Sequence, residues 1–162
     1  NWEKAPVTHL QGLTLDEMAD GVVGRIQQLA DDRRWEVLFI TTRPTAAGAT
    51  TQAQSQEWLA AKGFRHPSVY VFKGSRGKVA SALDLDAVVD DRPENCLDVA
   101  TESHAKAVLV WSGSAEALGS TMTRHRVVVT ASIGEALDEL VQLDRAKRGG
   151  VVRSIKRMLG KA

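Results

Sequence analysis

The stretch Asp86-Ala87-Val88-Val89-Asp90-Asp91-Arg92-Pro93-Glu94-Asn95 decides how the rest of this chain is interpreted. Its apolar run is too short for a helix and ends in two adjacent carboxylates, after which Pro93 suits the first turn of a helix. Ligands of α/β domains bind at the carboxyl ends of strands, so a strand ending in Asp90 and Asp91 can hold a divalent cation. A second interpretation keeps Asp90 inside the strand end and uses Asp91 to cap the helix that begins at Pro93.

Composition and charge narrow the possible classes of protein. The 162 residues are 43% hydrophobic and 25% charged, which is typical of one globular domain that buries a core. A net charge of +1 argues against binding nucleic acid or membranes through the whole surface, so any basic function must be local. The single cysteine, Cys96, fits a reducing compartment, so we predict a cytoplasmic protein in which Cys96 serves packing. No apolar run approaches the length of a membrane span, so we expect no spanning segment.

Helical and strand periodicities alternate along the chain. The pattern predicts strands over 36–41, 68–72, 86–90, 106–111 and 126–130, and helices over 15–29, 51–62, 78–83, 93–101 and from 132 onward. Capping boxes mark three of the helix starts, at Thr14, Thr51 and Ser132. This alternation predicts a three-layer α/β/α, Rossmann-like domain, with a mainly parallel sheet covered on both faces.

Polar residues follow several of these strands at the point where each strand ends. Because the carboxyl ends of parallel strands share one edge of the sheet, these residues should converge there. A hydroxyl, a lysine and paired carboxylates at one edge suit a phosphate held against Mg²⁺. The residues concerned are Thr41, Thr42, Arg43, Lys78, Asp90 and Asp91.

The order of these segments resembles a known family. Residues 39–44 (FITTRP), Gly77-Lys78 and residues 88–93 (VVDDRP) resemble motifs two, three and four of the haloacid dehalogenase (HAD) superfamily. The resemblance is closest to its deoxyribonucleotidase and polynucleotide 3′-phosphatase branches, and it covers about residues 13–140. It implies a HAD-type fold without a large cap domain. It also implies a Mg²⁺-dependent phosphomonoesterase acting on a phosphorylated small molecule, such as a nucleotide, or on a nucleic-acid end.

The resemblance also implies a role for each matching residue. The motif-two hydroxyl and motif-three lysine of the family bind the phosphoryl group, and these catalytic roles would fall on Thr41 and Lys78. Thr42 and Arg43 would lie near the substrate. The motif-four pair, Asp90 and Asp91, would hold Mg²⁺.

One element of the family pattern is missing from the sequence. The first motif, Asp-x-Asp at the end of the first strand, supplies the nucleophile and the acid/base, and nothing before Leu13 resembles it. That strand lies between those ending at Thr41 and Asp90, so we expect these two to flank a slot without pairing. We expect an upstream segment to fill the slot, and the chain taken alone to be inactive. Alternatively, residues 6–10 (PVTHL) fill it in a catalytically inactive binding or assembly module.

The end of the chain forms a separate segment by its pattern. We predict a HAD-like α/β domain over residues 1–148, a boundary at Gly149-Gly150, and a basic amphipathic tail over 149–162. The tail either packs back on the domain or contacts a partner helix, an acidic surface or nucleic acid. Its apolar positions are Val151, Val152, Ile155, Met158 and Leu159, and its basic positions are Arg153, Lys156, Arg157 and Lys161.

Overall fold

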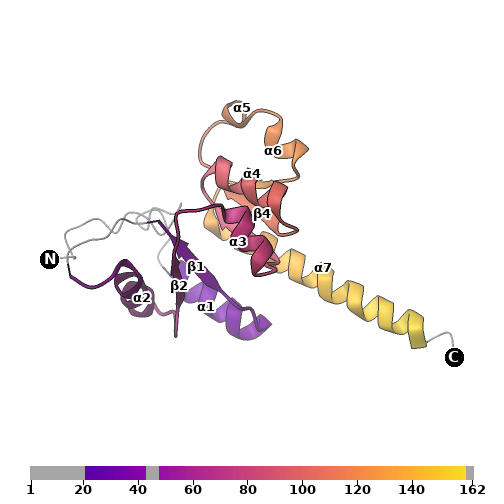
Figure 1. Ribbon diagram of the computed structural model, residues 1–162. Helices are drawn as coiled ribbons and strands as arrows, with labels where there is room; N and C mark the ends of the chain where they lie inside the picture. Colours follow the sequence, from indigo (N-terminus) through magenta and orange to yellow (C-terminus); the bar gives the residue numbers. More distant parts are fainter. Residues whose placement is uncertain (1–20, 43–47, 160–162) are drawn as a thin grey trace.

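The computed structural model describes residues 21–42 and 48–159, and it alternates strands and helices as the sequence predicts (Figure 1). The strands are β1 (Leu38–Thr41), β2 (Ser68–Val71), β3 (Ala87–Asp90), β4 (Lys106–Val110) and β5 (Val128–Thr130). The helices are α1 (Val22–Arg33), α2 (Thr51–Ala61), α3 (Arg76–Ala82), α4 (Pro93–Glu102), α5 (Ala115–Leu118), α6 (Thr121–Arg124) and α7 (Ile133–Leu159).

All strand pairs of the described residues are parallel, which confirms the predicted α/β class. The strands form two sheets, β1-β2 and β3-β4-β5. In these ranges β1 pairs with β2, and β3 pairs with β4, so β1 and β3 are not hydrogen-bonded neighbours. This agrees with the expected separation of the strands that end at Thr41 and Asp90. Residues 6–10, one of the two expected occupants of the slot, lie outside the described residues.

Helices cover both faces of the three-stranded sheet, which gives the predicted three layers. On one face, Val88 and Leu109 pack in a cluster with residues of α3 and α4. On the other, Val89 and Val108 pack with residues of α1 and α7. Adjacent residues of one strand therefore face opposite layers, as the period of a β-strand requires. No inserted cap domain interrupts the elements of residues 21–42 and 48–159.

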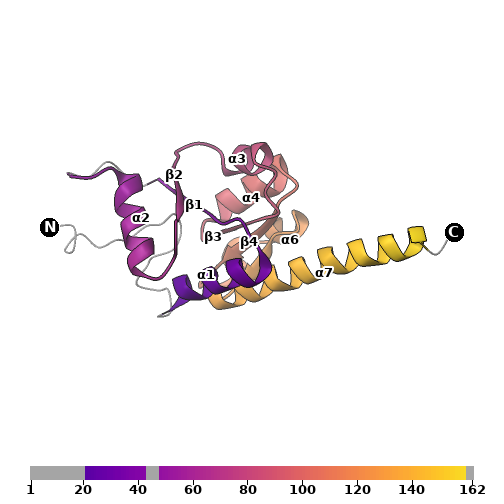
Figure 2. The same cartoon turned by 90° about the horizontal axis from the view of Figure 1, so that it is seen from below.

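Helix α1 packs against both sheets. Val22 belongs to the cluster of β4 and α7, whereas Val23 belongs to the cluster of β1, β2 and α2. Ile26 contacts both clusters. Figure 2 shows α1 and α7 running beside each other, and ion pairs Arg25–Asp138 (2.7 Å) and Arg33–Asp144 (2.8 Å) join them. One helix thus contributes side chains to the cores of both sheets.

Three details differ from the sequence prediction. Helix α2 is capped by Thr50, whose side chain accepts from the backbone N–H of Ala53, one residue earlier than predicted. Helix α3 begins at Arg76, not at Lys78, because Ser75 accepts from the backbone N–H of Lys78 and caps the first turn. Helices α5 and α6 were not predicted, since four residues are too short to show a helical period.

The long C-terminal helix runs across the predicted boundary at Gly149-Gly150. The backbone of α7 stays helical through Gly149 and Gly150, so this pair does not interrupt the helix. Glycine in a helix interior costs only about 1 kcal/mol relative to alanine, which a helix of 27 residues tolerates. In the part of the chain that the structure describes, no helix is long and apolar enough to cross a membrane.

Candidate functional site

The site is built around the end of β3, where Asp90 is 4% exposed. One carboxylate oxygen accepts from the backbone N–H of Arg92 (2.9 Å) and the other from Asn95 Nδ2 (3.0 Å). Burial raises the pKa of Asp90, and the two hydrogen bonds partly offset this. The carboxylate therefore stabilises the turn from β3 into α4 while lying at the predicted sheet edge.

The cap position of α4 is not Asp91, contrary to the second interpretation of the sequence. The residue before the first turn of α4 is Arg92, and it makes no side-chain capping bond. Pro93 occupies the first turn, as predicted, since it lacks the N–H that would need a partner there. Asp91 is half-buried and adjacent to Asp90 in the turn. The two adjacent carboxylates are the pair that the sequence predicts as ligands of a divalent cation.

The end of β1 supplies the predicted hydroxyls. Thr41 is fully buried at the last position of the strand, and Thr42 follows it half-buried. The carbonyl of Thr41 accepts from the backbone N–H of Phe72 (2.9 Å), which extends the pairing with β2 by one residue. Arg43 lies outside the described residues.

Arg76 connects the two strand ends, and sequence reasoning missed it. The residue is 4% exposed, and its guanidinium donates from both terminal nitrogens to the carbonyl of Phe72 (3.2 Å each). Burial lowers the pKa of Arg76, and the charge of Asp90 opposes that shift. Asp90 in turn experiences the charge of Arg76. A buried cation is therefore bonded at the β1–β2 end and exerts its charge on the carboxylate of β3.

Lys78 is not among the groups whose charge acts on Asp90. It is exposed in the first turn of α3, and its charge lowers the pKa of Asp98, on α4. Burial alone would raise the pKa of Asp98, but hydrogen bonds from the Gly77 N–H and the Ser75 hydroxyl (2.8 Å each) outweigh it. The charge of Lys78 thus acts on Asp98, and the charge of Arg76 acts on Asp90.

Gly77 explains why α3 can approach α4 so closely. A Cβ built on Gly77 would lie 2.6 Å from Cβ of Glu102 and would also meet the backbone carbonyl of Asp98. Any larger residue would push the helices apart. Close packing of α3 on α4 thus explains the glycine of the Gly77-Lys78 motif, independently of any ligand of Lys78.

Cys96 has no nucleophilic role in this arrangement. It is fully buried on α4, and its thiol donates to the carbonyls of Asp90 (3.8 Å) and Val108 (3.7 Å). Burial raises the pKa of Cys96 to about 12, so the thiolate is not populated at neutral pH. The predicted packing role is confirmed.

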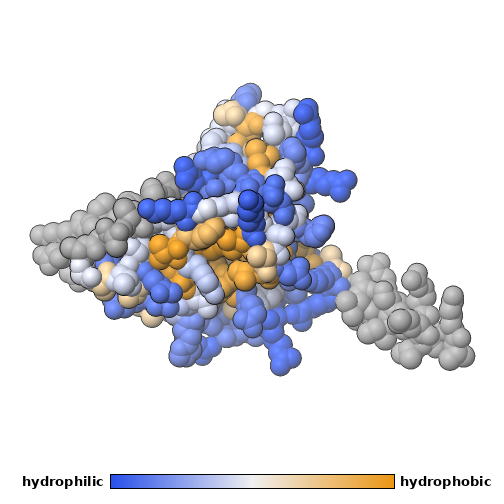
Figure 3. All heavy atoms as spheres, viewed as in Figure 1, coloured by the Kyte–Doolittle hydropathy of each residue, from blue (hydrophilic) through white to orange (hydrophobic). Residues whose placement is uncertain are grey.

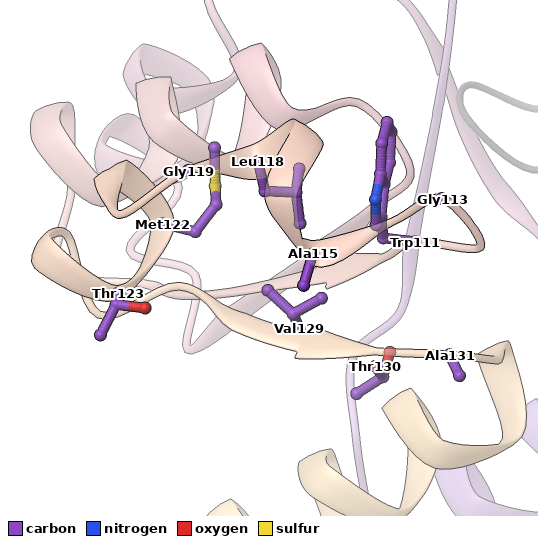
Figure 4. Close-up of a pocket in the computed structure, with 10 residues that line it drawn as sticks. All are labelled: Trp111, Gly113, Ala115, Leu118, Gly119, Met122, Thr123, Val129, Thr130 and Ala131. Atoms are coloured by element: carbon purple, nitrogen blue, oxygen red, sulfur yellow. The ribbon is translucent and has the colours of Figure 1, made fainter.

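A pocket of about 270 Å³ opens away from this site, between β5 and the α5–α6 segment. Figure 4 shows Leu118 and Met122 on one side and Val129 on the other, with Trp111 at one end. No charged residue lines it, and it includes none of the predicted site residues. Its lining therefore offers mainly apolar contacts and no charged group for binding or catalysis.

For a metal, the described residues offer the Asp90–Asp91 pair. Within residues 21–42 and 48–159 there is no group of three or more His, Cys, Asp or Glu that could hold an ion. Two adjacent carboxylates are a donor set that suits Mg²⁺, which commonly binds one or two carboxylates and keeps water or phosphate as its other ligands.

Fold and site together define a parallel α/β domain with a carboxylate pair at the carboxyl edge of its sheet. No protein-family model, curated protein or solved structure matches this chain. Its function is therefore inferred from the site alone.

Proposed function

We propose that this chain is a HAD-like phosphatase domain that hydrolyses a phosphomonoester with Mg²⁺, on a nucleotide or a polynucleotide end. The observation that carries the proposal is that the buried Arg76 donates to the carbonyl of Phe72, beside the end of β1, while its charge acts on Asp90 at the end of β3. A buried cation whose charge acts on a carboxylate at a strand end suits recognition of a phosphoryl group. The cytoplasm is the compartment that the single cysteine favours.

In this proposal the residues of the chain divide the work of binding. Thr41 and Lys78 hold phosphoryl oxygens, and Thr42 and Arg43 contact the rest of the substrate. Asp90 and Asp91 hold Mg²⁺, which when bound would neutralise phosphate charge and orient the ester. Both carboxylate oxygens of Asp90 keep a second lone pair after their bonds to Arg92 and Asn95.

The nucleophile must come from a carboxylate that none of these residues supplies. The proposal places it on a strand between β1 and β3, where positioning in line with the phosphorus converts binding into reaction. Support comes from the two strands themselves. The first three residues of β1 and of β3 are only half-buried, although all are apolar, whereas Ala107 to Leu109 of β4 are buried.

The test compares residues 1–162 with the same chain carrying an N-terminal strand that ends in Asp-x-Asp. With Mg²⁺, we expect nucleotide monophosphates and 3′-phosphorylated oligonucleotides to be hydrolysed by the extended chain only. Asn at the first Asp of the added strand should abolish turnover. Metal-dependent turnover by the unextended chain, lost in Lys78→Ala, would show that the nucleophile lies elsewhere.

A non-catalytic binding or assembly module is the second candidate. One observation favours it: each oxygen of Asp90 already has a partner inside its own turn, which is a structural role. Calorimetry separates the two. The phosphatase proposal expects Mg²⁺ to bind weakly to residues 1–162 and not to the Asp90→Asn, Asp91→Asn double variant. Equal Mg²⁺ binding by both proteins would remove the metal site and leave the module.

A further inference from the structure

The second half of α7 leaves the domain. Figures 1 and 2 show this helix running past the last element of the domain and ending away from it in both views. Twenty-seven residues of α-helix span about 40 Å. Its contacts with the body of the protein include those of Lys147 with Asp86 and of Arg148 with the carbonyl of Arg33. Beyond Arg148 begins the segment that both views show projecting.

The sequence of this projecting segment is amphipathic on a helix. At 100° per residue, the positions of Val151, Val152, Ile155, Met158 and Leu159 fall on one side. The remaining side carries Arg153, Lys156 and Arg157, and residues 149–162 contain no acidic residue. The acidic residues of α7, from Glu135 to Asp144, all lie in the half that contacts the domain.

We infer that the C-terminal half of α7 binds the surface of an anionic lipid bilayer. A partner that matches this pattern covers an apolar stripe and neutralises the positive charges beside it, and an anionic bilayer interface offers both. Nucleic acid would satisfy the charges but leaves the apolar stripe in water. A second copy of the helix would cover the stripe but brings a second set of like charges beside the first. The helix lies in the interface plane and keeps the α/β domain in the aqueous phase.

The test uses the full chain with vesicles in co-sedimentation. We expect binding to mixed phosphatidylcholine–phosphatidylserine vesicles, at least about tenfold weaker binding to phosphatidylcholine alone, and loss of binding as salt rises. The Arg153→Glu, Arg157→Glu variant should lose at least about tenfold in affinity. Lys62→Glu, Arg124→Glu, which changes the charge equally at two exposed positions of the domain, should bind as the parent does.

A second variant separates lipid from other partners. Ile155→Ser, Met158→Ser keeps every charge, and it should also lose vesicle binding, because insertion of the apolar stripe is removed. Binding by this variant equal to the parent would overturn the inference. Tight binding of a DNA or RNA duplex without vesicle binding would also overturn it. So would a dimer in analytical ultracentrifugation that becomes monomeric in the Ile155→Ser, Met158→Ser variant. Circular dichroism and thermal unfolding of each variant confirm that the domain remains folded.

Discussion

The β3–β4–β5 side of the molecule and the β1–β2 side use similar apolar strands, yet they bury them to different extents. Strand β4, with a neighbour on each edge and a helix layer on each face, has Val108 and Leu109 fully buried. On β2, Val69 is buried but Tyr70 is 53% exposed. Figure 3 shows apolar surface in the middle of this face, where Figure 1 draws β1 and β2. Burial thus depends on neighbours and layers, and the strand sequence alone does not determine it.

The largest expected effect tests this difference with the same substitution on both sides. Leu109→Ala should lower the free energy of unfolding by about 3 kcal/mol, since it opens a cavity between β4 and the layer of α3 and α4. Leu38→Ala, in half-buried β1, should cost only about 1 kcal/mol. Urea denaturation of both variants measures this. Equal costs would mean that the two sides are packed alike.

The packing of α3 against α4, beside the three-stranded sheet, gives the next largest expected change in stability. Gly77→Ala should cost about 2 kcal/mol, because the new methyl meets Glu102 and the backbone of Asp98. Gly24→Ala is the matched control: it lies in α1 with nothing within 4 Å of its built Cβ, and it should raise stability by about 0.5 kcal/mol. Thermal unfolding of the pair checks both signs. A neutral Gly77→Ala would show that α3 can move away from α4 at no cost.

The bonds of Asp98 to the start of α3 predict a pH dependence. Its pKa in the folded protein lies below the usual 3.8, so its stabilisation is present above that pH and is lost as pH falls through the folded value. Asp98→Asn should cost about 1.5 kcal/mol at neutral pH and progressively less in acid. Asp138→Asn, which removes an exposed ion pair, should change stability little at any pH. A cost for Asp98→Asn that does not vary with pH would mean that the charge of Asp98 plays no part.

For Asp90 we expect a pH dependence of stability with the opposite sign to that of Asp98, and the smallest change in the free energy of unfolding. Burial raises its pKa above 3.8, so its ionisation makes the folded state less stable as pH rises from 3.8 through the folded value. Asp90→Asn should therefore change stability by less than about 1 kcal/mol at neutral pH, and its stability relative to the parent should improve as pH rises. Denaturation at a series of pH values measures the trend. A large loss at neutral pH would instead mean that the carboxylate is needed to hold the turn.

The sequence predicts what depends on local pattern. The class of fold, the order of the strands and the β3 turn at Asp90 follow from periodicity and from Pro93, and the structure has them. The roles of Arg76 and Asp98 could not be predicted, because both depend on how α3 meets α4 and β3. In the sequence Arg76 lies in a glycine-bounded stretch read as a loop, and only Ser75, as a possible cap, marks the helix start. The predicted functions of the site residues stay predictions; these residues are Thr41, Thr42, Arg43, Lys78, Asp90 and Asp91.

Helix α1 has a consequence for how the molecule melts. Its consecutive residues Val22 and Val23 are each buried, one in the core of each sheet. If either sheet lost its core, one of these two valines would become exposed. Because the valines are adjacent on one helix, α1 cannot leave one sheet and stay packed on the other without that cost. The two sheets should therefore unfold cooperatively, as a single transition with coincident far-UV and tryptophan signals, although no backbone hydrogen bond of the described strands joins them.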